Sequence, residues 1–314
     1  MNIIFFASSQ FSISSLEALI KSGFQISCVV TQPDKKKGRH LQLGETAVKE
    51  LARTSGLKIY QPDNINSKEA IKFLAGLKAD LFVVIAYGQI LSKEILDLPK
   101  IFAINVHASL LPKYRGAAPI NWAIIDGEDE TGVTVIKLIE KMDAGPIIMQ
   151  NTLKIAKDDT AFSLSARLSE LGSKVLLESI ELINNKRYQL SPQSNKQVTL
   201  APKLKKRDGA IDWKKTAKEI HDLARGCFPW PGAYTYYKGG ILKLLKTNIL
   251  PSAANQRFTE PGTIKGMHNN EIVVATSKDD LTIQELQLEG KRGMTAKEFL
   301  SGHAIKAGER FDKK

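Results

Sequence analysis

Two polar side chains stand at the end of one apolar stretch of the chain. Asn105 and His107 alternate with apolar residues in what reads as a buried strand, and Ser109 begins a loop rich in glycine and proline. Side chains two residues apart on a strand point to the same side, so we expect these three to share one face. An amide and a protonated imidazole both donate hydrogen bonds. Together they could stabilise an oxyanion that develops at a carbonyl group.

A charged imidazole needs a partner, and Asp143 is the best candidate. It lies in the segment 141–146, Lys-Met-Asp-Ala-Gly-Pro, which we predict to be a turn between two strands. An Asp close to a Gly in a turn usually stabilises the turn itself. Spacing along the sequence does not show whether Asp143 reaches His107, so this pairing is a hypothesis.

Other reaction classes lack their usual sequence signals. The chain has no Gly-x-Ser-x-Gly elbow, no metal-ligand constellation and no phosphate-binding glycine pattern after its first strand. Its two cysteines, Cys28 and Cys227, lie away from the 104–112 stretch and belong to no Cys or His cluster. Nucleophilic catalysis, a structural zinc and a nucleotide cofactor are therefore disfavoured. Direct acyl transfer without a metal remains.

Apolar strand signals alternate with helical spacing through the first part of the chain. Strands are predicted near 2–7, 24–31, 80–86 and 101–107, with amphipathic helices between them. Short apolar strands separated by helices indicate a mainly parallel α/β sheet covered on both faces. Ligands of such a sheet bind at the carboxyl ends of its strands, which is where the amide and the imidazole stand.

The pattern changes after residue 188. Residues 189–208 are polar, lack clear periodicity and read as a linker. A helix near 214–226 and several strand-like runs separated by Gly or Asn/Asp turns follow, which indicates a small antiparallel barrel or sheet. We therefore predict a first domain at 1–188, this linker, and a second domain at 209–314.

The net charge of +12 on the 314-residue chain is unevenly distributed. Residues 1–188 contain 23 Lys and Arg against 20 Asp and Glu, whereas residues 189–314 contain 22 against 13. An excess gathered in one part favours a nucleic-acid-facing segment over a generally basic surface. The densest basic run, at 34–40, either contacts phosphates or forms a solvated loop.

No stretch of the sequence is expected to cross a membrane. The longest apolar run, near 81–87, is far too short to span a bilayer. The apolar start at 1–7 has no basic region before it and reads as a first strand rather than a signal peptide. The two isolated cysteines read as buried small hydrophobes in a reducing compartment. We expect a cytoplasmic monomer.

Several motifs together resemble the methionyl-tRNA formyltransferase family over essentially the whole chain. Residues 105–112, Asn-Val-His-Ala-Ser-Leu-Leu-Pro, are similar to the signature of folate-dependent formyltransferases, and residues 115–120 extend it. The similarity includes Thr31-Gln32-Pro33-Asp34, Ala86-Tyr87-Gly88, Gly132-Val133-Thr134, Ile211-Asp212-Trp213 and Phe228-Pro229-Trp230-Pro231. One turn departs from the family, because Ser8-Ser9-Gln10 stands where a Gly-Thr-Pro usually follows the first strand.

The resemblance implies a Rossmann-like formyltransferase domain followed by an OB-like β-barrel that binds tRNA. It implies transfer of a formyl group from 10-formyltetrahydrofolate to the α-amino group of methionyl initiator tRNA. By position, the residues that match the catalytic trio are Asn105, His107 and Asp143. Those that match the folate-contacting segment are Ser109, Leu110, Leu111 and Pro112. Those that match the loop entering the acceptor-stem region of the tRNA are Lys35, Lys36, Lys37 and Arg39.

Four alternatives stay open on the sequence alone. Formyl transfer to an amino sugar nucleotide would need no extended basic surface, and a hydrolase that releases formate would share the same trio. A non-catalytic RNA-binding protein would explain the charge and the barrel, but not Asn105 and His107 at a strand end. A nicotinamide-dependent dehydrogenase would explain the sheet but lacks the glycine fingerprint.

Overall fold

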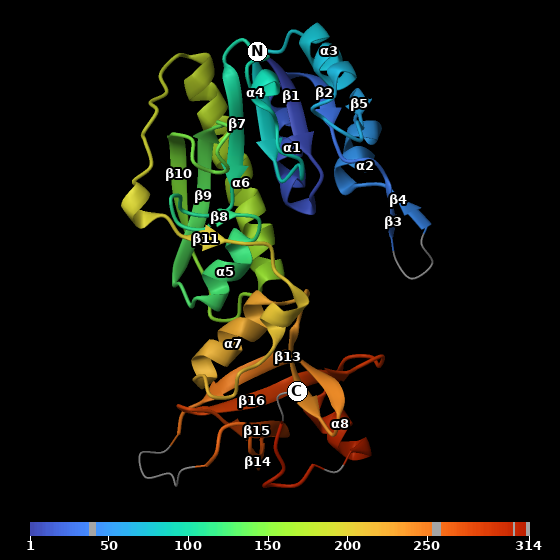
Figure 1. Ribbon diagram of the computed structural model, residues 1–314, viewed down its shortest axis with the longest axis vertical. Coiled ribbons are helices and arrows are strands. Elements are labelled where there is room, and N and C mark those ends of the chain that lie inside the picture. The colour runs from blue at the N-terminus through green and yellow to red at the C-terminus, as the bar shows by residue number, and fades with distance from the viewer. Residues whose placement is uncertain (38–41, 253–258, 304, 312–314) are drawn as a thin grey trace. The chain divides into compact units, whose positions relative to one another are not determined.

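Contacts within the chain divide it into two compact units. The computed structural model describes residues 1–314 except 38–41, 253–258, 304 and 312–314, and at 35–37 and 42–43 it describes the backbone alone (Figure 1). The first unit consists of Met1–Pro119, Glu130–Lys154 and Ser165–Pro202. The second consists of Ile120–Asp129, Ile155–Leu164 and Lys203–Lys314.

The first unit contains most of the strands and helices. Its strands are β1 (Asn2–Ala7), β2 (Gln25–Val30), β3 (Lys35–Lys37), β4 (Gln42–Gly44), β5 (Ile59–Tyr60), β6 (Leu81–Ile85), β7 (Phe102–His107), β8 (Arg115–Gly116), β9 (Glu130–Lys137), β10 (Ile147–Lys154) and β11 (Leu200–Ala201). Its helices are α1 (Ile13–Lys21), α2 (Ala47–Thr54), α3 (Lys68–Gly76), α4 (Lys93–Leu96) and most of α6 (Ala161–Asn184), with 3-10 turns η1 (Gln10–Ser12) and η2 (Asn195–Gln197).

Seven strands form the main sheet, in the order β10-β9-β7-β6-β1-β2-β5. The strands from β7 to β5 are parallel, β9 runs antiparallel to β7, and β10 runs antiparallel to β9. The chain builds outward on one side of β1 and then on the other, as doubly wound sheets do. The predicted mainly parallel α/β sheet is confirmed, with an antiparallel edge at β9 and β10.

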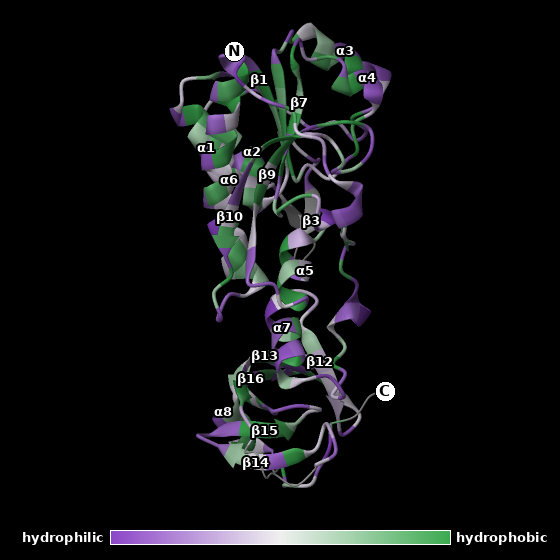
Figure 2. Cartoon of the chain, turned by 90° about the vertical axis from the view of Figure 1, so that its left-hand side faces the viewer, coloured by the Kyte–Doolittle hydropathy of each residue, from purple (hydrophilic) through white to green (hydrophobic). Residues whose placement is uncertain are grey.

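Successive residues of these strands face opposite sides of the sheet. One core packs α3 and α4 against a set of strand residues that includes Ile4, Phe6, Cys28, Val30, Phe82, Val84 and Ala103. Val106 faces the other way, where it approaches Gly172 of α6. Figure 2 shows α1 and α6 on one side of the apolar strands and α3 and α4 on the other. Asn105 and His107 therefore share the face of Ala103, as the alternation predicts.

Two segments for which the sequence predicts no strand contain short ones. Residues 32–44 contain the antiparallel hairpin of β3 and β4. Residues 189–208 contain η2 and β11, and β11 pairs in parallel with β8. These strands are only two or three residues long, too short to leave a periodic signal. The contacts group residues up to Pro202 with the first unit, whereas the sequence predicts domain limits at 188 and 209.

An antiparallel sheet dominates the second unit. Its elements are α5 (Pro119–Ile125), η3 (Lys206–Gly209), α7 (Ala217–Gly226), β12 (Ala233–Tyr237), β13 (Gly240–Leu250), β14 (Ile264–His268), β15 (Glu271–Ala275), β16 (Asp280–Leu288), β17 (Met294–Thr295) and α8 (Ala296–Gly302). The strand order is β12-β13-β16-β15-β14, with β17 beside β16. Trp213 and Phe311 stack in its core. The predicted antiparallel strands are confirmed, and closure into an OB-like barrel stays a prediction.

Two segments from within the predicted 1–188 domain belong to the second unit. Asn121 Nδ2 donates to the carbonyl oxygen of Gly226 at 2.8 Å, and Arg225 Nη1 donates to that of Asp159 at 2.6 Å. A Cβ on Gly226 would lie 2.5 Å from the Ile125 side chain, so the backbone of α7 packs directly against a side chain of α5 at this point. The first helix after the 105–119 stretch is thus built into the second unit.

The described residues also bear on the membrane and cysteine predictions. No helix among them is long and apolar enough to cross a membrane. Cys28 and Cys227 are free and buried, and burial raises the pKa of each thiol to about 12. Such thiols are poor nucleophiles at neutral pH. Both cysteines are the buried small hydrophobes that the sequence predicts.

Candidate active site

Asn105 and His107 lie at the carboxyl end of β7. In the sheet register Asn105 is opposite Val84 of β6 and Ile136 of β9. Because Val84 belongs to the core beneath α3 and α4, the Asn105 side chain lies on that face of the sheet. His107 is 6% exposed, and Asn105 is half-buried. Within the described part of the chain the Asn105 amide makes no hydrogen bond. Its N–H groups are therefore available to a ligand.

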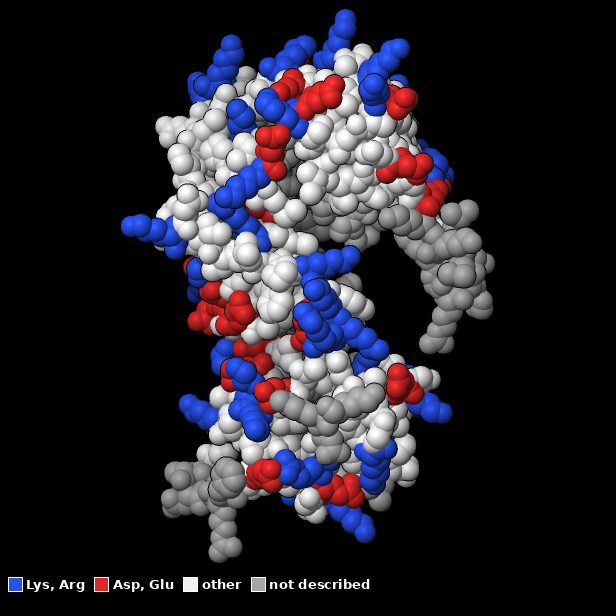
Figure 3. Space-filling view, viewed as in Figure 1, with Lys and Arg blue, Asp and Glu red and all other residues white. Residues whose placement is uncertain are grey.

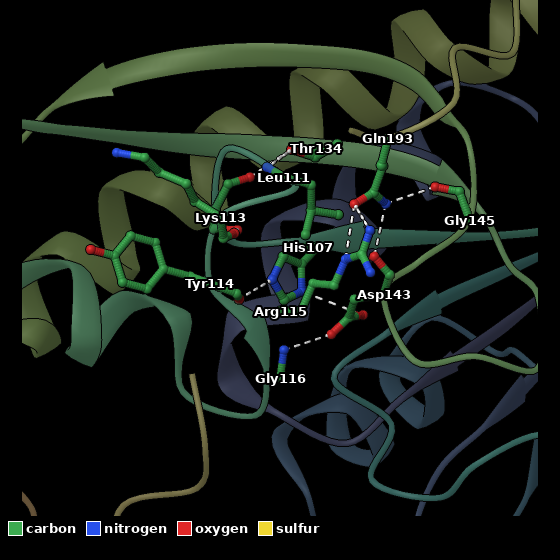
Figure 4. A network of polar contacts seen from close by, with 11 residues as sticks. His107, Leu111, Lys113, Tyr114, Arg115, Gly116, Thr134, Asp143, Gly145 and Gln193 are labelled. Carbon is green, nitrogen blue, oxygen red and sulfur yellow. Dashed lines mark hydrogen bonds and ion pairs between the residues drawn. The ribbon is translucent and has the colours of Figure 1, made fainter. Parts of the chain in front are cut away.

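Protein groups face both ring nitrogens of His107 (Figure 4). Nε2 lies 2.9 Å from the carbonyl oxygen of Tyr114, which can only accept, so Nε2 carries a hydrogen and donates. Nδ1 lies 3.6 Å from Oδ1 of Asp143, an ion-pair separation that exceeds a normal hydrogen bond. The structure thus brings His107 and Asp143 together, which sequence spacing could not establish.

Asp143 reaches His107 from the segment between β9 and β10. Its backbone has a φ of +49°, in the left-handed region that is uncommon for residues other than glycine. Oδ2 of Asp143 accepts a hydrogen bond of 2.9 Å from the backbone N–H of Gly116. Gly145 passes so close to β9 that a Cβ would overlap the carbonyl oxygen of Lys137. The backbone of this turn, and hence the direction of the carboxylate, is closely constrained.

A glutamine from the 189–208 segment holds this turn. Gln193 Nε2 donates to the carbonyl oxygens of Asp143, at 2.8 Å, and Gly145, at 2.7 Å. Its Oε1 accepts from Nε and Nη2 of Arg115, at 3.0 and 2.7 Å. Figure 4 shows the glutamine between the guanidinium and the turn. We refer to Gln193 with Arg115, Asp143 and Gly145 as the Gln193 clamp.

A second polar network holds the loop that follows His107. Thr134, opposite His107 on β9, donates through Oγ1 to the carbonyl oxygen of Ser109 at 2.6 Å and accepts from the N–H of Leu111 at 3.1 Å. Gln150 Nε2 donates to Thr134 Oγ1 at 2.8 Å and to the carbonyl oxygen of Leu111 at 3.0 Å. We refer to Thr134 and Gln150 with Ser109 and Leu111 as the loop brace.

The loop brace decides which parts of the predicted folate-contacting segment stay accessible. Ser109 is fully buried, and its Oγ donates to the carbonyl oxygen of Lys113 at 2.6 Å. Leu111 is buried as well. Leu110 and Pro112 are half-buried and present apolar surface. The side chains of Ser109 and Leu111 thus shape the loop, whereas Leu110 and Pro112 can meet a ligand.

The basic run lies on the hairpin of β3 and β4. Lys35–Lys37 form β3, but their side chains, and all of Arg39, lie outside the described residues. At the base of the hairpin Lys49 forms an ion pair of 2.5 Å with Asp34. Gln61 Nε2 also donates to Asp34, at 2.9 Å. These contacts fix the point from which the basic run leaves the sheet.

Figure 3 shows basic side chains on each of the two units, with acidic side chains among them. Part of the excess in the second unit is neutralised locally, since Lys218 and Arg225 both pair with the buried Asp222. Several other lysines of the second unit form no ion pair within the described part of the chain: Lys203, Lys205, Lys206, Lys214, Lys243 and Lys246. A phosphate backbone can use such unpaired cations.

The sequence pointed to Asn105, His107 and Asp143 as candidates, but it did not point to most of the groups that hold them. Tyr114 acts through a backbone carbonyl, which its residue type cannot reveal. Gln193 lies in an aperiodic polar segment, where nothing in the local pattern distinguishes it from its neighbours. Thr134, in the Gly132-Val133-Thr134 motif, and Arg115, in the 115–120 motif, did carry a signal. Among the described residues, no three His, Cys, Asp or Glu side chains are grouped as metal ligands would be.

Known families match both parts of the chain. Residues 1–180 match the formyl transferase family, and residues 203–304 match the C-terminal domain of formyl transferases. The chain therefore belongs to the formyl transferase family, and the fold and the donor groups around His107 fit that class of enzyme.

Curated relatives specify the family further. The methionyl-tRNA formyltransferase of Thermodesulfovibrio yellowstonii is 45% identical over 306 residues, which cover 98% of this chain and 97% of that protein. The methionyl-tRNA formyltransferase of Acetivibrio thermocellus is 42% identical over 309 residues, 98% of this chain and 99% of that protein. The resemblance that the motifs predict is confirmed over both units.

Solved structures share the fold. WlaRD, a sugar 3N-formyl transferase solved with dTDP and 5-N-formyl-THF, has a TM-score of 0.68 at 21% identity, over 93% of this chain and 99% of that chain. HypX from Aquifex aeolicus, in complex with tetrahydrofolic acid, has a TM-score of 0.62 at 16% identity, over 99% of this chain and 50% of that chain. At these identities the likeness concerns the fold.

Proposed function

We propose that this enzyme transfers a formyl group from 10-formyltetrahydrofolate to the α-amino group of methionyl initiator tRNA. The observation that carries the proposal is the identity of 42% and 45% to two methionyl-tRNA formyltransferases over 98% of this chain, a span that includes both units. The product is N-formylmethionyl-tRNA for translation initiation. We accordingly propose a cytoplasmic enzyme that acts as a monomer.

In the proposed reaction the neutral amine of the methionyl group attacks the formyl carbon. A new C–N bond forms and negative charge develops on the formyl oxygen. The unbonded amide of Asn105 is available to donate to that oxygen. His107 Nε2 already donates to Tyr114, so it must exchange that carbonyl for the formyl oxygen when substrate binds. Removing one donor from such a site typically costs about 10²–10³ in rate.

Asp143 has two roles in this proposal. Its Oδ1, 3.6 Å from Nδ1, orients the His107 ring and stabilises a positive charge on it. It also positions a water molecule that carries the proton from the attacking amine to the folate nitrogen as the bond from that nitrogen to the formyl carbon breaks. Atoms and charge balance without a metal or a redox partner.

The residues at the site fit a folate in the formyl-donor position. Leu110 and Pro112 leave apolar surface beside the end of β7, and Met142, next to Asp143, is 57% exposed. Apolar side chains next to a few hydrogen-bonding groups are typical of cofactor sites. We propose that Leu110 and Pro112 contact the pterin ring, while Ser109 and Leu111 maintain the shape of the loop.

We propose that Lys35, Lys36, Lys37 and Arg39, with the unpaired lysines of the second unit, hold the tRNA through its phosphates. Binding should then weaken steeply with salt, because each neutralised phosphate releases counterions. Charge reversal at these four positions should raise the KM for tRNA while leaving the affinity for folate unchanged. A tRNA affinity that is flat between low and moderate salt would reject the phosphate contacts.

The test of the function is a formyl-transfer assay with 10-formyltetrahydrofolate and three acceptors. Methionyl initiator tRNA, methionyl elongator tRNA and an amino sugar nucleotide are compared at equal concentrations. We expect transfer to initiator tRNA above both others. Equal transfer to the two tRNAs would reject the preference for the initiator. Transfer to the sugar alone, or release of formate alone, would reject the tRNA as acceptor.

A further inference from the structure

We propose that Gln193 is a positioning residue for the formyl-transfer reaction, a role that rests on the proposed function of Asn105, His107 and Asp143. The hydrogen bonds of the Gln193 side chain go to Arg115, Asp143 and Gly145 rather than to His107 itself. The glutamine thus contacts the two chain segments that hold the two ring nitrogens of His107.

The side chain of Gln193 uses its full hydrogen-bonding capacity. Its amide hydrogens are donated to Asp143 and Gly145, and its oxygen accepts twice from Arg115. The guanidinium it binds is itself buried, with 7% of Arg115 exposed. A partly buried amide with four partners adopts one orientation, because any rotation places a donor against a donor or an oxygen against an oxygen.

One pair of these bonds fixes Asp143. The residue has a left-handed backbone, which a non-glycine residue keeps only where its surroundings enforce it. Gln193 holds the carbonyl groups of Asp143 and of Gly145 two residues later. The carboxylate is then aimed with Oδ1 toward His107 Nδ1 and Oδ2 toward the N–H of Gly116.

The other pair of bonds fixes Arg115. The residue before it is Tyr114, whose carbonyl oxygen faces His107 Nε2. The backbone N–H groups of Tyr114 and Arg115 are also tied to Thr199, one to its Oγ1 at 2.8 Å and the other to its carbonyl oxygen at 2.9 Å. One glutamine therefore connects the segment beside Nδ1 to the segment beside Nε2.

The segment that carries Gln193 is itself anchored on both sides. Ser191 exchanges two backbone hydrogen bonds with Ile147, at 2.8 and 2.9 Å. Farther along, β11 pairs with β8, and a Cβ on Gly116 would lie 2.5 Å from the carbonyl oxygen of Ala201. Gln193 thus enters the site from a fixed stretch of backbone, as a positioning residue requires.

The role predicts a loss in turnover rather than in acceptor binding. With 10-formyltetrahydrofolate and methionyl initiator tRNA, Gln193→Ala should lower kcat about 10- to 100-fold, the range found for groups that orient catalytic side chains. The KM for tRNA should change by less than about threefold. Gln193→Glu should lose as much, because one carboxylate oxygen would face two carbonyls without a hydrogen between them. Gln197→Ala and Gln197→Glu, at an exposed glutamine four residues on, should behave as the wild type.

A double-mutant cycle separates positioning from general structural support. In an Asp143→Asn background, Gln193→Ala should change kcat by less than about threefold, because the group it positions is already disabled. If the two effects on kcat multiply, Gln193 does not act through Asp143 and the proposal is overturned. An unchanged kcat in the single variant overturns it as well.

Backbone hydrogen exchange tests the same role without turnover. The amide of Gly116 donates to Asp143 Oδ2, so Gln193→Ala should speed its exchange about tenfold, while the amides of β6 stay protected. Unchanged exchange at Gly116 would overturn the positioning role. If the wild type formylated no tRNA, the proposed function would fail, and this measurement would still decide whether Gln193 holds Asp143.

Discussion

The loop brace and the Gln193 clamp support the same histidine by different means. The brace is built on β9 and β10, where Thr134 and Gln150 are directly opposite each other in an antiparallel register. The clamp is built on an irregular segment, and Gln193 lies 50 residues from Asp143 and 78 from Arg115 along the chain. One network shapes the loop after β7, and the other orients a charged partner of His107.

The difference concerns how each network would fail. Thr134 is fully buried, so a lost hydroxyl there leaves the Ser109 carbonyl and the Leu111 N–H of the loop without that partner. Gln193 is only partly buried, and water can replace some of its bonds. We therefore expect removal of a hydrogen-bonding side chain from the brace to lower mainly stability, and removal of one from the clamp to lower mainly turnover. A backbone overlap within the clamp, as at Gly145, should lower both.

The largest effect is expected from Gly145→Ala, which breaks the clamp through its backbone. The new Cβ would overlap the Lys137 carbonyl oxygen, so the turn that carries Asp143 must move. We expect a loss of about 3 kcal/mol in the free energy of unfolding, typical of an overpacked site. Turnover should fall by about 10² or more. Urea unfolding and steady-state kinetics measure both.

Gly76→Ala is the matched control for that variant. Gly76 ends α3 and has open space around it, so alanine should leave kcat unchanged and add up to about 1 kcal/mol of stability. A Gly145→Ala enzyme with normal stability and normal turnover would contradict the close approach to β9.

The next effect is expected from Thr134→Val, which breaks the brace at nearly constant side-chain shape. The change removes the partner of the Ser109 carbonyl and the Leu111 N–H, and should cost about 2 kcal/mol. Thr131→Val, also on β9, provides the contrast. Within the described residues Thr131 Oγ1 is buried without a hydrogen bond, so valine there should be neutral or stabilising. Equal losses in the two variants would refute the brace.

A smaller effect, on stability alone, is expected from breaking the capping box of α7, a network far from the site in sequence. Thr216 and Glu219 bond reciprocally, and Thr216→Ala should cost about 1 kcal/mol without changing kcat. The backbone bond from Thr216, then Lys215 and the Thr216 hydroxyl, lower the pKa of Glu219 to about 2.

The sign of the pH dependence follows from that lowered pKa. The contribution of Glu219 is present above pH 4.5 and is lost as the pH falls toward 2, because the folded state must then accept a proton it binds weakly. Urea midpoints of the wild type should therefore approach those of Glu219→Gln across this interval. Parallel curves for the two proteins would contradict the assignment.

Much of the fold could be predicted from the sequence because its cause is local. Short apolar runs marked β1, β2, β6 and β7, and helical spacing marked helices between them such as α1. The period of two along a strand placed Asn105 and His107 on one face. Short strands such as β8 and β11 could not be predicted, because they hold one another through backbone bonds that no residue type specifies.

The sequence points to the candidate reactive groups of the site but not to most of the groups that support them. His107 and Asp143 have side chains whose chemistry suggests a role, so residue types drew attention to them. Tyr114 contributes a carbonyl oxygen, and Gln193 contributes an ordinary amide whose meaning depends on the fold. Polar contacts between residues this far apart in sequence form only in the folded chain, so the sequence pattern does not reveal them. The location of α5 in the second unit was unpredictable for the same reason.

We propose that the hydrogen-bond donors at the end of β7 carry out formyl transfer. The most direct test is the single-turnover rate of formyl transfer to methionyl initiator tRNA, at saturating 10-formyltetrahydrofolate, for the wild type and for His107→Ala. We expect a rate about 10²–10³ lower in the variant, with both substrates still bound. A rate within about threefold of the wild type would contradict the role of His107 and, with it, the reaction centre described for this enzyme.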